Sequence, residues 1–405
     1  MRNGSLVHRV QKLHEEYGDM VRLAPNEVSF IDAKACRDIY AYRPGHRTFP
    51  KNQVWVPTPP KIGGKAPSIL NADDEDHTRI RRAWGYGFSE KALKDQEPLI
   101  TSHVDMLVER LRQQIDSTSG AAVLDIAKWY NFCAFDIIGD LAFGESFGCL
   151  NGQKYHSWVE TIIHHFKTAV LMSACRYYPL LYRLLVWSVP KSSIKKQQQH
   201  SLTVKEKVEK RLGTKQDRPD LLSHLTKARH GLTDMEIEST AGIIIIAGSN
   251  SLTTTLAGTT NYLLRFPETL EKLSQEIRNA FKTETEMNLT NLGKLPYLSA
   301  VIEEGLRIIS PIPLGMPRVV PKGGDFVCGE WLPEDVSPSH ITIHVPKADK
   351  FLERPVSLSC NGEPVSPKKI LHSQRNLSQS AGWSLVKLLH LHLRSTVEML
   401  YSRSL

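Results

Sequence analysis

A histidine and an arginine stand four residues apart, a spacing at which both side chains could bind one anion. His77 and Arg81 lie in the segment 71–82, in which residues 73–76 are four consecutive acids. Acidic residues are favoured at the start of a helix by its dipole, so this segment predicts a helix N-terminus. Residues four apart share a helix face, and both side chains can therefore reach one anionic group. Taken alone, such a pair is more often a solvated, charged helix end.

Two further segments carry charged residues that could form an ion pair or bind an anion. Glu304 and Arg307 are three apart and can pair on one helix face, bidentately if buried. A bare Glu-x-x-Arg is usually only a surface ion pair. Arg318 follows the proline-rich segment 311–317, and without its surroundings it is equally well explained as a solvent-facing turn residue.

The longest helical pattern begins at Thr233, which forms a Ser/Thr-x-x-Glu capping box with Glu236, and it runs until Pro267. Such a helix is about 50 Å long at about 1.5 Å per residue. No residue from 239 to 264 is charged, so a membrane span is one interpretation. Eleven of those 26 residues are Ser, Thr or Asn, which is too polar for a lipid-facing helix. We therefore expect a buried central helix.

The elements that position these residues are predicted to be mostly helical. Apolar residues at helical spacing predict four more helices, over 7–17, 99–112, 127–142 and 155–168. The alternation from 20 to 30 around a Pro-Asn turn predicts a hairpin, and residues 319–342 return to short strands broken by Gly-Gly and Pro. The pattern indicates a mainly α fold with minor β.

Composition narrows the class of protein. Hydrophobic residues are 41% and charged residues 23% of 405 residues, as in an ordinary soluble domain. Lys and Arg outnumber Asp and Glu by 51 to 43, but the surplus is spread thinly, so we expect no nucleic-acid partner. Six scattered cysteines without a C-x-x-C pair suit a reducing compartment. The N-terminus shows no signal peptide or membrane anchor.

Five segments, in this order along the chain, resemble the cytochrome P450 monooxygenases, and especially the fungal secondary-metabolite type of the trichothecene and polyketide pathways. They are residues 13–18 with the Val-Arg-x-Ala-Pro-Asn-Glu stretch that follows, 71–89, 247–251, 295–307 and 311–318. The resemblance implies a cytochrome P450-like fold, mainly α with minor β and incomplete at both ends. It is good over 7–342, so we expect a P450-like domain over 1–354 and a divergent tail over 355–405.

The resemblance also implies a haem cofactor and roles for residues around it. His77, Arg81 and Arg318 would bind its propionates. Glu304 and Arg307 would lock the core together with Arg354, which lies in the segment 350–354, a possible remnant of the family's Pro-Glu-Arg meander. The family normally sits on the endoplasmic reticulum by an anchor that is not seen here, so we expect a cytoplasmic protein or one peripheral at that membrane.

Gly248, Asn250 and Ser251 occupy the position of the family's oxygen-activation motif, Ala-Gly-x-acid-Thr, in which the acid and the alcohol relay protons. Asn250 can hydrogen-bond but cannot ionise, and Ser251 lacks the methyl group that stiffens threonine. We therefore expect impaired proton delivery. Without the resemblance, a patch of small residues on a buried helix is more often a close packing contact.

No segment matches the family's Phe-x-x-Gly-x-Arg-x-Cys-x-Gly loop, whose cysteine thiolate ligates the haem iron. Cys360 is a weak candidate for that metal ligand, because only Gly362 fits the pattern around it. Residues 355–405 hold ten Ser, ten Leu, no Asp and no Phe. A frame-shifted or mis-spliced end would explain this composition.

The predicted activity is insertion of one oxygen atom into a C–H bond of a small apolar polyketide or terpenoid, with electrons from an NADPH-dependent flavoprotein reductase. Because the haem-ligand loop is missing, we expect the chain to be inactive or impaired. The alternative is a non-catalytic relic, or a protein that binds a hydrophobic ligand or partner. A helical membrane-surface protein outside this family would make the five ordered matches coincidental.

Overall fold

The computed structural model shows a mainly helical fold with two small sheets, so the predicted mainly α class with minor β is confirmed. It describes residues 6–58, 66–117, 123–160, 172–189, 191–214, 218–227, 230–283 and 286–340. The described helices are α1 (Leu6–Tyr17), α2 (Ala33–Tyr40), α3 (Asp74–Gly85), the 3-10 turn η1 (Tyr86–Phe88), α4 (Glu90–Ser117), α5 (Ile126–Phe143), α6 (Cys149–Gly152), α8 (Pro179–Ser188), α9 (Lys191–Gly213), α10 (Ser223–Lys227), α11 (Asp234–Arg265), α12 (Pro267–Ala280), α13 (Leu289–Leu292) and α14 (Pro296–Ile308). The described strands are β1 (Met20–Ala24), β2 (Glu27–Phe30), β3 (Asp325–Val327), β4 (Glu330–Leu332) and β5 (Ser337–His340).

Most elements follow the sequence patterns that predict them. α1 and the antiparallel β1–β2 hairpin coincide with the helix and hairpin expected near the N-terminus. The patterns over 99–112 and 127–142 fall inside α4 and α5, and α4 begins earlier than predicted and contains Pro98. Most of the helix predicted over 155–168 lies outside the described residues.

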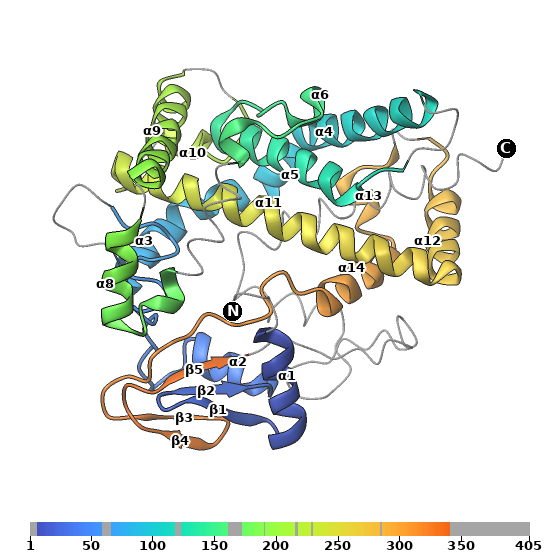
Figure 1. Ribbon diagram of the computed structural model, residues 1–405. Coiled ribbons are helices and arrows are strands. Elements are labelled where there is room, and N and C mark those ends of the chain that lie inside the picture. The colour runs from blue at the N-terminus through green and yellow to red at the C-terminus, as the bar shows by residue number, and fades with distance from the viewer. Residues whose placement is uncertain are drawn as a thin grey trace.

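α11 crosses the whole helical part of the molecule (Figure 1). The hydroxyl of Thr233 accepts a hydrogen bond from the Glu236 N–H at 3.3 Å, and the Glu236 carboxylate accepts one from the Thr233 N–H at 2.8 Å. These two bonds are the predicted capping box. Arg79 of α3 forms an ion pair with the same carboxylate, so α3 is tied to the start of α11. The helix ends at Arg265, directly before α12.

The uncharged stretch of α11 forms part of the protein core. Within the described ranges, α11 is the one helix long and apolar enough to span a membrane by length and composition, yet it packs against α5, α9, α12 and α14. Three of its buried hydroxyl groups, those of Ser249, Thr253 and Thr255, donate to carbonyls one turn earlier, as Ser249 does to Ile245 at 2.8 Å. Such bonds satisfy hydroxyl groups away from water. The structure thus agrees with the buried central helix expected from the sequence.

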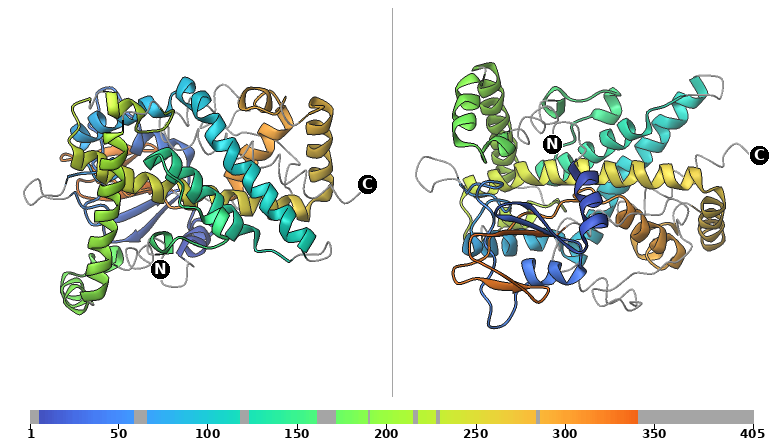
Figure 2. Two further views of the ribbon diagram at one scale, coloured as in Figure 1. Left: turned by 90° about the horizontal axis from the view of Figure 1, so that it is seen from above. Right: turned by 60° about the horizontal axis from the view of Figure 1, so that its bottom comes forward.

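Glycines set how closely the neighbouring helices approach α11. A Cβ atom on Gly258 would lie 2.2 Å from Ile309 Cδ1, and one on Gly305 of α14 would lie 2.3 Å from Thr259 Oγ1. α5 makes the most extensive contact with α11, and α4 packs in turn against α5 (Figure 2). The largest buried cluster therefore joins α3, α4, α5, α11, α12 and α14.

Two small sheets lie at the other end of the molecule beside α1 and α2 (Figure 1). β5 joins β2 in parallel, with Glu27 opposite Ser337 and Phe30 opposite His340. β3 and β4 form an antiparallel hairpin. The short strands predicted within 319–342 are confirmed up to residue 340, whereas the pairing of β5 with β2 was not predicted. This pairing brings the end of the described chain beside its beginning.

Gly305→Ala is expected to weaken the contact between α14 and α11, because the added methyl group would collide with Thr259. We expect the free energy of unfolding to fall by about 1–3 kcal/mol, as is usual for overpacking. Gly85→Ala is the control, since a Cβ there meets nothing within 4 Å and alanine favours a helix. Urea unfolding measures both variants, and equal stabilities would contradict this account of the packing.

Candidate anion-binding site

α3 presents His77 and Arg81 on one half-buried face, as their spacing predicts. The helix begins at a capped N-terminus, where the Asp73 carboxylate accepts a hydrogen bond from the Asp76 N–H at 2.9 Å. Trp84 anchors the helix in the core. The side chains of His77 and Arg81 form no hydrogen bond or ion pair with other described residues, so both are available to a ligand.

Arg318 reaches the same region from a different segment. Residues 317–319 pair with 50–52, since Val319 N–H donates to Pro50 O at 2.9 Å and Asn52 N–H donates to Pro317 O at 3.1 Å. The Arg318 guanidinium carbon lies 5.7 Å from the centre of the Tyr40 ring, a cation–π distance. Its Nε atom is buried without a hydrogen-bond partner in the described part of the chain. Arg318 is thus fixed by its neighbours but has donor capacity left.

Lys51 is a fourth basic residue of this region, and sequence analysis missed it. Its side chain is buried, and its Nζ atom donates to Ala72 O at 2.9 Å and to Ile69 O at 3.3 Å. The backbone of Lys51 pairs with that of Arg318. A lone lysine in a proline-containing stretch forms no spacing pattern, so no sequence signal pointed to it.

Lys51, His77, Arg81 and Arg318 together form what we call the cationic cluster. Burial, followed by the charges of Lys51, Arg81 and Arg318, lowers the pKa of His77 to about 4. Burial and the Arg318 charge lower the pKa of Lys51 to about 8, and burial also lowers the pKa of Arg318. Asp74 opposes these shifts only in part. The positive charges of Lys51, Arg81 and Arg318 therefore disfavour a further positive charge on His77 in this partly buried region.

The cationic cluster differs from other arginine sites of the fold because none of its members forms an ion pair with a described carboxylate. Four other arginines that are at least partly buried are paired: Arg79 with Glu236, Arg211 with Asp220, Arg218 with Asp140 and Arg307 with Glu304. Unpaired buried charge is costly unless a bound anion neutralises it. The cluster therefore fits a ligand with two carboxylates, and the propionates of haem meet this requirement.

The predicted oxygen-site residues lie on α11. A Cβ atom on Gly248 would be 3.0 Å from Ile138 Cδ1 of α5, so this glycine allows close helix packing. The Ser251 hydroxyl donates to Ala247 O, while Asn250 is half-buried. The structure brings these residues onto one turn of a core helix, and their role in oxygen chemistry stays a prediction.

Glu304 and Arg307 form the predicted ion pair on α14. Arg307 Nε donates to Glu304 Oε2 at 2.6 Å and Nη2 donates to Oε1 at 2.5 Å, which is a bidentate geometry. The Glu304 carboxylate is buried, and its hydrogen bonds raise the pKa of Arg307. Arg354, the predicted third partner, lies outside the described residues, as does Cys360.

The described cysteines offer no match for the iron end of haem. Burial raises the pKa of Cys133, and it raises those of Cys149 and Cys328 to about 11. These side chains therefore remain neutral thiols at pH 7, whereas iron binds the thiolate. The described residues also contain no group of three or more His, Cys, Asp or Glu placed to hold a metal ion. The fold thus fits the carboxylate end of haem but shows no iron ligand in its described part.

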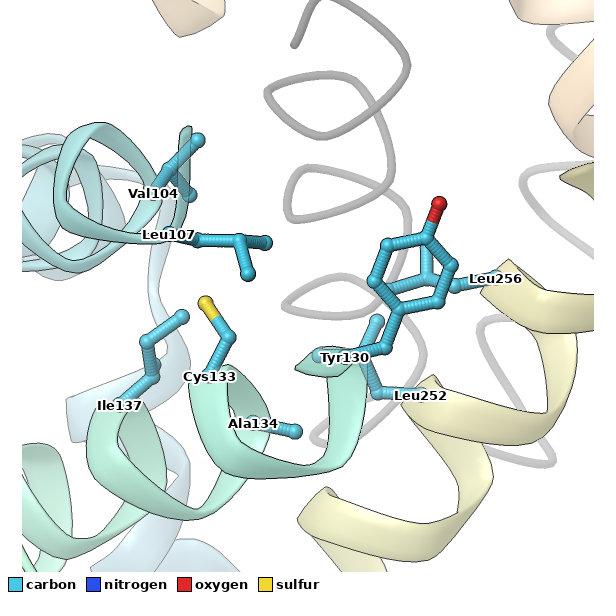
Figure 3. Close-up of a pocket in the computed structure, with 8 residues that line it drawn as sticks. All are labelled: Val104, Leu107, Tyr130, Cys133, Ala134, Ile137, Leu252 and Leu256. Carbon is cyan, nitrogen blue, oxygen red and sulfur yellow. The ribbon is translucent and has the colours of Figure 1, made fainter. Parts of the chain in front are cut away.

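A small cavity between α4, α5 and α11 is too small to hold a cofactor (Figure 3). Its volume is about 10 Å³, about the least space that a single water molecule needs. Eight side chains line it: Val104, Leu107, Tyr130, Cys133, Ala134, Ile137, Leu252 and Leu256. The cavity is a packing gap of the core.

Arg307→Met is expected to destabilise the chain strongly, because it leaves the Glu304 carboxylate buried without a partner. We expect the free energy of unfolding to fall by about 3–5 kcal/mol, the usual cost of breaking a buried pair. Lys94→Met removes the cation of the exposed Glu90–Lys94 pair and should cost at most about 0.5 kcal/mol. Chemical denaturation compares the two variants, and a small loss for Arg307→Met would show that the pair does not hold α14.

Comparisons with known proteins match these observations. The cytochrome P450 family model matches residues 1–332. The chain is 40% identical over 339 residues to cytochrome P450 monooxygenase astJ of Aspergillus oryzae, 40% identical over 343 residues to cytochrome P450 monooxygenase efuB of Hormonema carpetanum, and 38% identical over 333 residues to averantin hydroxylase of Dothistroma septosporum. These matches cover 83%, 83% and 82% of this chain, and 67%, 67% and 61% of the relatives. The chain thus spans about two thirds or less of their length.

Among solved structures, the cytochrome P450DA heme domain superposes with a TM-score of 0.72 at 15% identity, covering 95% of this chain and 85% of that chain. This likeness shows the fold. The family match over most of the chain and the relatives near 40% identity show the family. The chain belongs to the cytochrome P450 family, and its relatives are fungal secondary-metabolite monooxygenases.

Proposed function

We propose that this chain binds haem through His77, Arg81 and Arg318, as part of a monooxygenase for a small apolar secondary metabolite, either a polyketide or a terpenoid. The observation that carries the proposal is the cationic cluster, whose members lack carboxylate partners among the described residues. When bound, haem supplies the iron at which dioxygen is activated for insertion of one oxygen atom into a C–H bond. Electrons come from an NADPH-dependent flavoprotein reductase.

The three residues contribute different interactions with the propionates. Because its pKa is about 4, His77 is neutral at pH 7 and donates one ring N–H. Arg318 donates from its unpartnered Nε atom, and Arg81 adds a second guanidinium from α3. Hydrogen bonds from charged donors to carboxylates are stronger than neutral ones. The two arginines therefore supply most of the electrostatic attraction for the propionates, and the hydrogen bond from His77 helps to orient them.

We further propose that oxygen chemistry is impaired in residues 1–405. Asn250 has no proton to release, and the Ser251 hydroxyl is engaged with the Ala247 carbonyl. Within this sequence Cys360 stands in a segment that matches the thiolate loop at one position only. The alternative is a non-catalytic protein that uses the same fold to bind a hydrophobic ligand or partner. The two differ in whether haem is bound at all.

The carbon monoxide difference spectrum of the reduced protein tests whether a cysteine of this chain ligates the iron. We expect haem-loaded chain to lack the red-shifted Soret band of thiolate ligation, because no segment matches the family's thiolate loop and burial raises the pKa of Cys133, Cys149 and Cys328. Cys360→Ser should give the same spectrum as the unchanged protein. A thiolate-type band that disappears in Cys360→Ser would overturn the proposed impairment, while a protein that takes up no haem would support the non-catalytic alternative.

We also propose that the protein associates peripherally with a membrane surface through α8. No residue of α8 is buried, and Leu180, Leu184 and Trp187, one helix face, are 76%, 63% and 88% exposed. An apolar patch of this kind marks an interaction site. Tryptophan favours the membrane interface, and the exposed Arg183 suits anionic headgroups.

Replacing the apolar face of α8 should release the protein from lipid vesicles. Leu184→Glu with Trp187→Glu is expected to weaken binding to vesicles of phosphatidylcholine and phosphatidylserine by about tenfold or more, since two large apolar groups leave the interface. Tyr42→Glu, at an aromatic residue that is 78% exposed outside α8, is the control and should bind as before. Cosedimentation measures the effect. Unchanged binding of the double variant would remove α8 from the proposed surface.

A further inference from the structure

We propose that Tyr40 is a positioning residue of this site. Its ring holds the Arg318 guanidinium in place for a carboxylate of the ligand, without using the N–H groups that the carboxylate needs. Tyr40 is the last residue of α2 and lies outside the five resembling segments. This role rests on the proposed function, because Tyr40 acts through Arg318 rather than on the ligand itself.

Tyr40 is fixed against the small sheet. Its hydroxyl accepts a hydrogen bond from the His340 N–H of β5 at 3.3 Å, and a Cβ atom on Gly315 would lie 2.5 Å from the same hydroxyl oxygen. The Gly315 N–H in turn donates to His340 O at 2.8 Å. Because α2 also packs against β5 (Figure 1), the ring is held beside the segment 315–318.

The guanidinium of Arg318 has few other contacts that could fix it. Its carbon atom lies 5.7 Å from the centre of the Tyr40 ring, and its Nη1 atom donates to Phe49 O at 3.4 Å, which is long for a hydrogen bond. Its Nε atom has no partner in the described part of the chain. Among the described residues, the ring and one long hydrogen bond are therefore the polar contacts that orient the charged end.

An aromatic ring holds an arginine differently from a carboxylate. A cation is attracted to the electron-rich face of the ring, whereas the N–H groups of a guanidinium point outward in its own plane. A carboxylate takes these N–H groups and neutralises the charge, as Glu304 does for Arg307. The Tyr40 ring therefore restrains Arg318 but leaves its donors to the ligand.

Tyr40 remains uncharged at neutral pH. Burial raises its pKa to about 12, so the side chain is a phenol at pH 7, and no phenolate competes with the ligand for Arg318. Burial lowers the pKa of Arg318, and the electron-rich ring favours the charged form that a carboxylate ligand requires.

Restraint of Arg318 before the ligand arrives should raise the affinity for carboxylates. A free arginine side chain loses rotamer freedom when it binds, and much of this loss is avoided when the side chain is already held. The ordering cost of one such side chain corresponds to about twofold to tenfold in affinity. Tyr40 should therefore strengthen binding of a carboxylate by a factor in this range.

Iron-free protoporphyrin tests this role apart from any iron ligand, and its dimethyl ester is the matched probe without carboxylates. Both dissociation constants follow from porphyrin absorbance at about pH 7, where both propionates are ionised. Their ratio, the preference for the diacid, reports carboxylate recognition, because the apolar contacts of the ring system are common to both probes. A merely structural role of Tyr40 would weaken both probes alike and leave this preference unchanged.

Tyr40→Leu removes the ring and is expected to lower the preference for the diacid by about twofold to tenfold. Tyr40→Phe keeps the ring and should retain the preference of the unchanged protein. Arg318→Met should lower the preference at least as much, and adding Tyr40→Leu to it should cause no further change. The control, Tyr297→Leu, removes a ring that lies 4.5 Å from Lys272 Nζ on other helices, and it should leave the preference unchanged.

The outcomes separate the role of Tyr40 from the proposed function. If Arg318→Met leaves the preference unchanged, Arg318 binds no carboxylate, and that part of the proposed function fails together with the role of Tyr40. If Arg318→Met lowers the preference but Tyr40→Leu does not, only Tyr40 is excluded. Should Tyr40→Leu not fold, a fluorinated phenylalanine in place of Tyr40 decides, because fluorine withdraws electrons from the ring face and largely keeps its shape. A lowered preference would then support the role, and an unchanged one would exclude it.

Discussion

The burial of α11 fixes the position of the elements around it. This helix is uncharged from Ser239 to Leu264, and leaving its apolar residues in water would forfeit a large hydrophobic stabilisation. α5 makes the most extensive contact with it, and α14 packs so closely that Gly305 admits no Cβ atom. Several hydroxyl groups of the helix, such as those of Ser249 and Thr253, donate to its own carbonyls, which satisfies them away from water. The position of α11 therefore determines where the neighbouring helices pack.

The cationic cluster depends on this arrangement and on the small sheet. The ion pair of Arg79 with Glu236 ties α3 to the N-terminus of α11, which places His77 and Arg81. The sheet places Arg318, because its N–H donates to Pro338 O at 3.1 Å and its carbonyl accepts from the Ser337 hydroxyl at 2.7 Å. Like charges are thus brought together by elements from distant parts of the sequence. Folding tolerates such a local cost at a site that a ligand later neutralises.

The sequence predicted features whose partners are close along the chain. Thr233 with Glu236, and Glu304 with Arg307, are three residues apart, so helix periodicity alone brings them together. The pairing of β5 with β2, and of Lys51 with Arg318, joins segments from opposite ends of the described chain. No local pattern encodes such contacts, so these features could be found only in the folded structure. The resemblance located the pair of His77 and Arg81, and separately Arg318, while their common lack of carboxylate partners among the described residues became visible only in the structure.

Hydrogen exchange of the full chain, measured by mass spectrometry, tests most directly whether α11 organises a folded P450 body. Exchange is slowest where opening requires global unfolding. The account predicts that amides in the middle of α11 and in α5 are the slowest in the protein and exchange with one common protection. Fast exchange throughout α11, with protection only in the sheets and isolated turns, would contradict it and would indicate a relic that no longer folds around this helix.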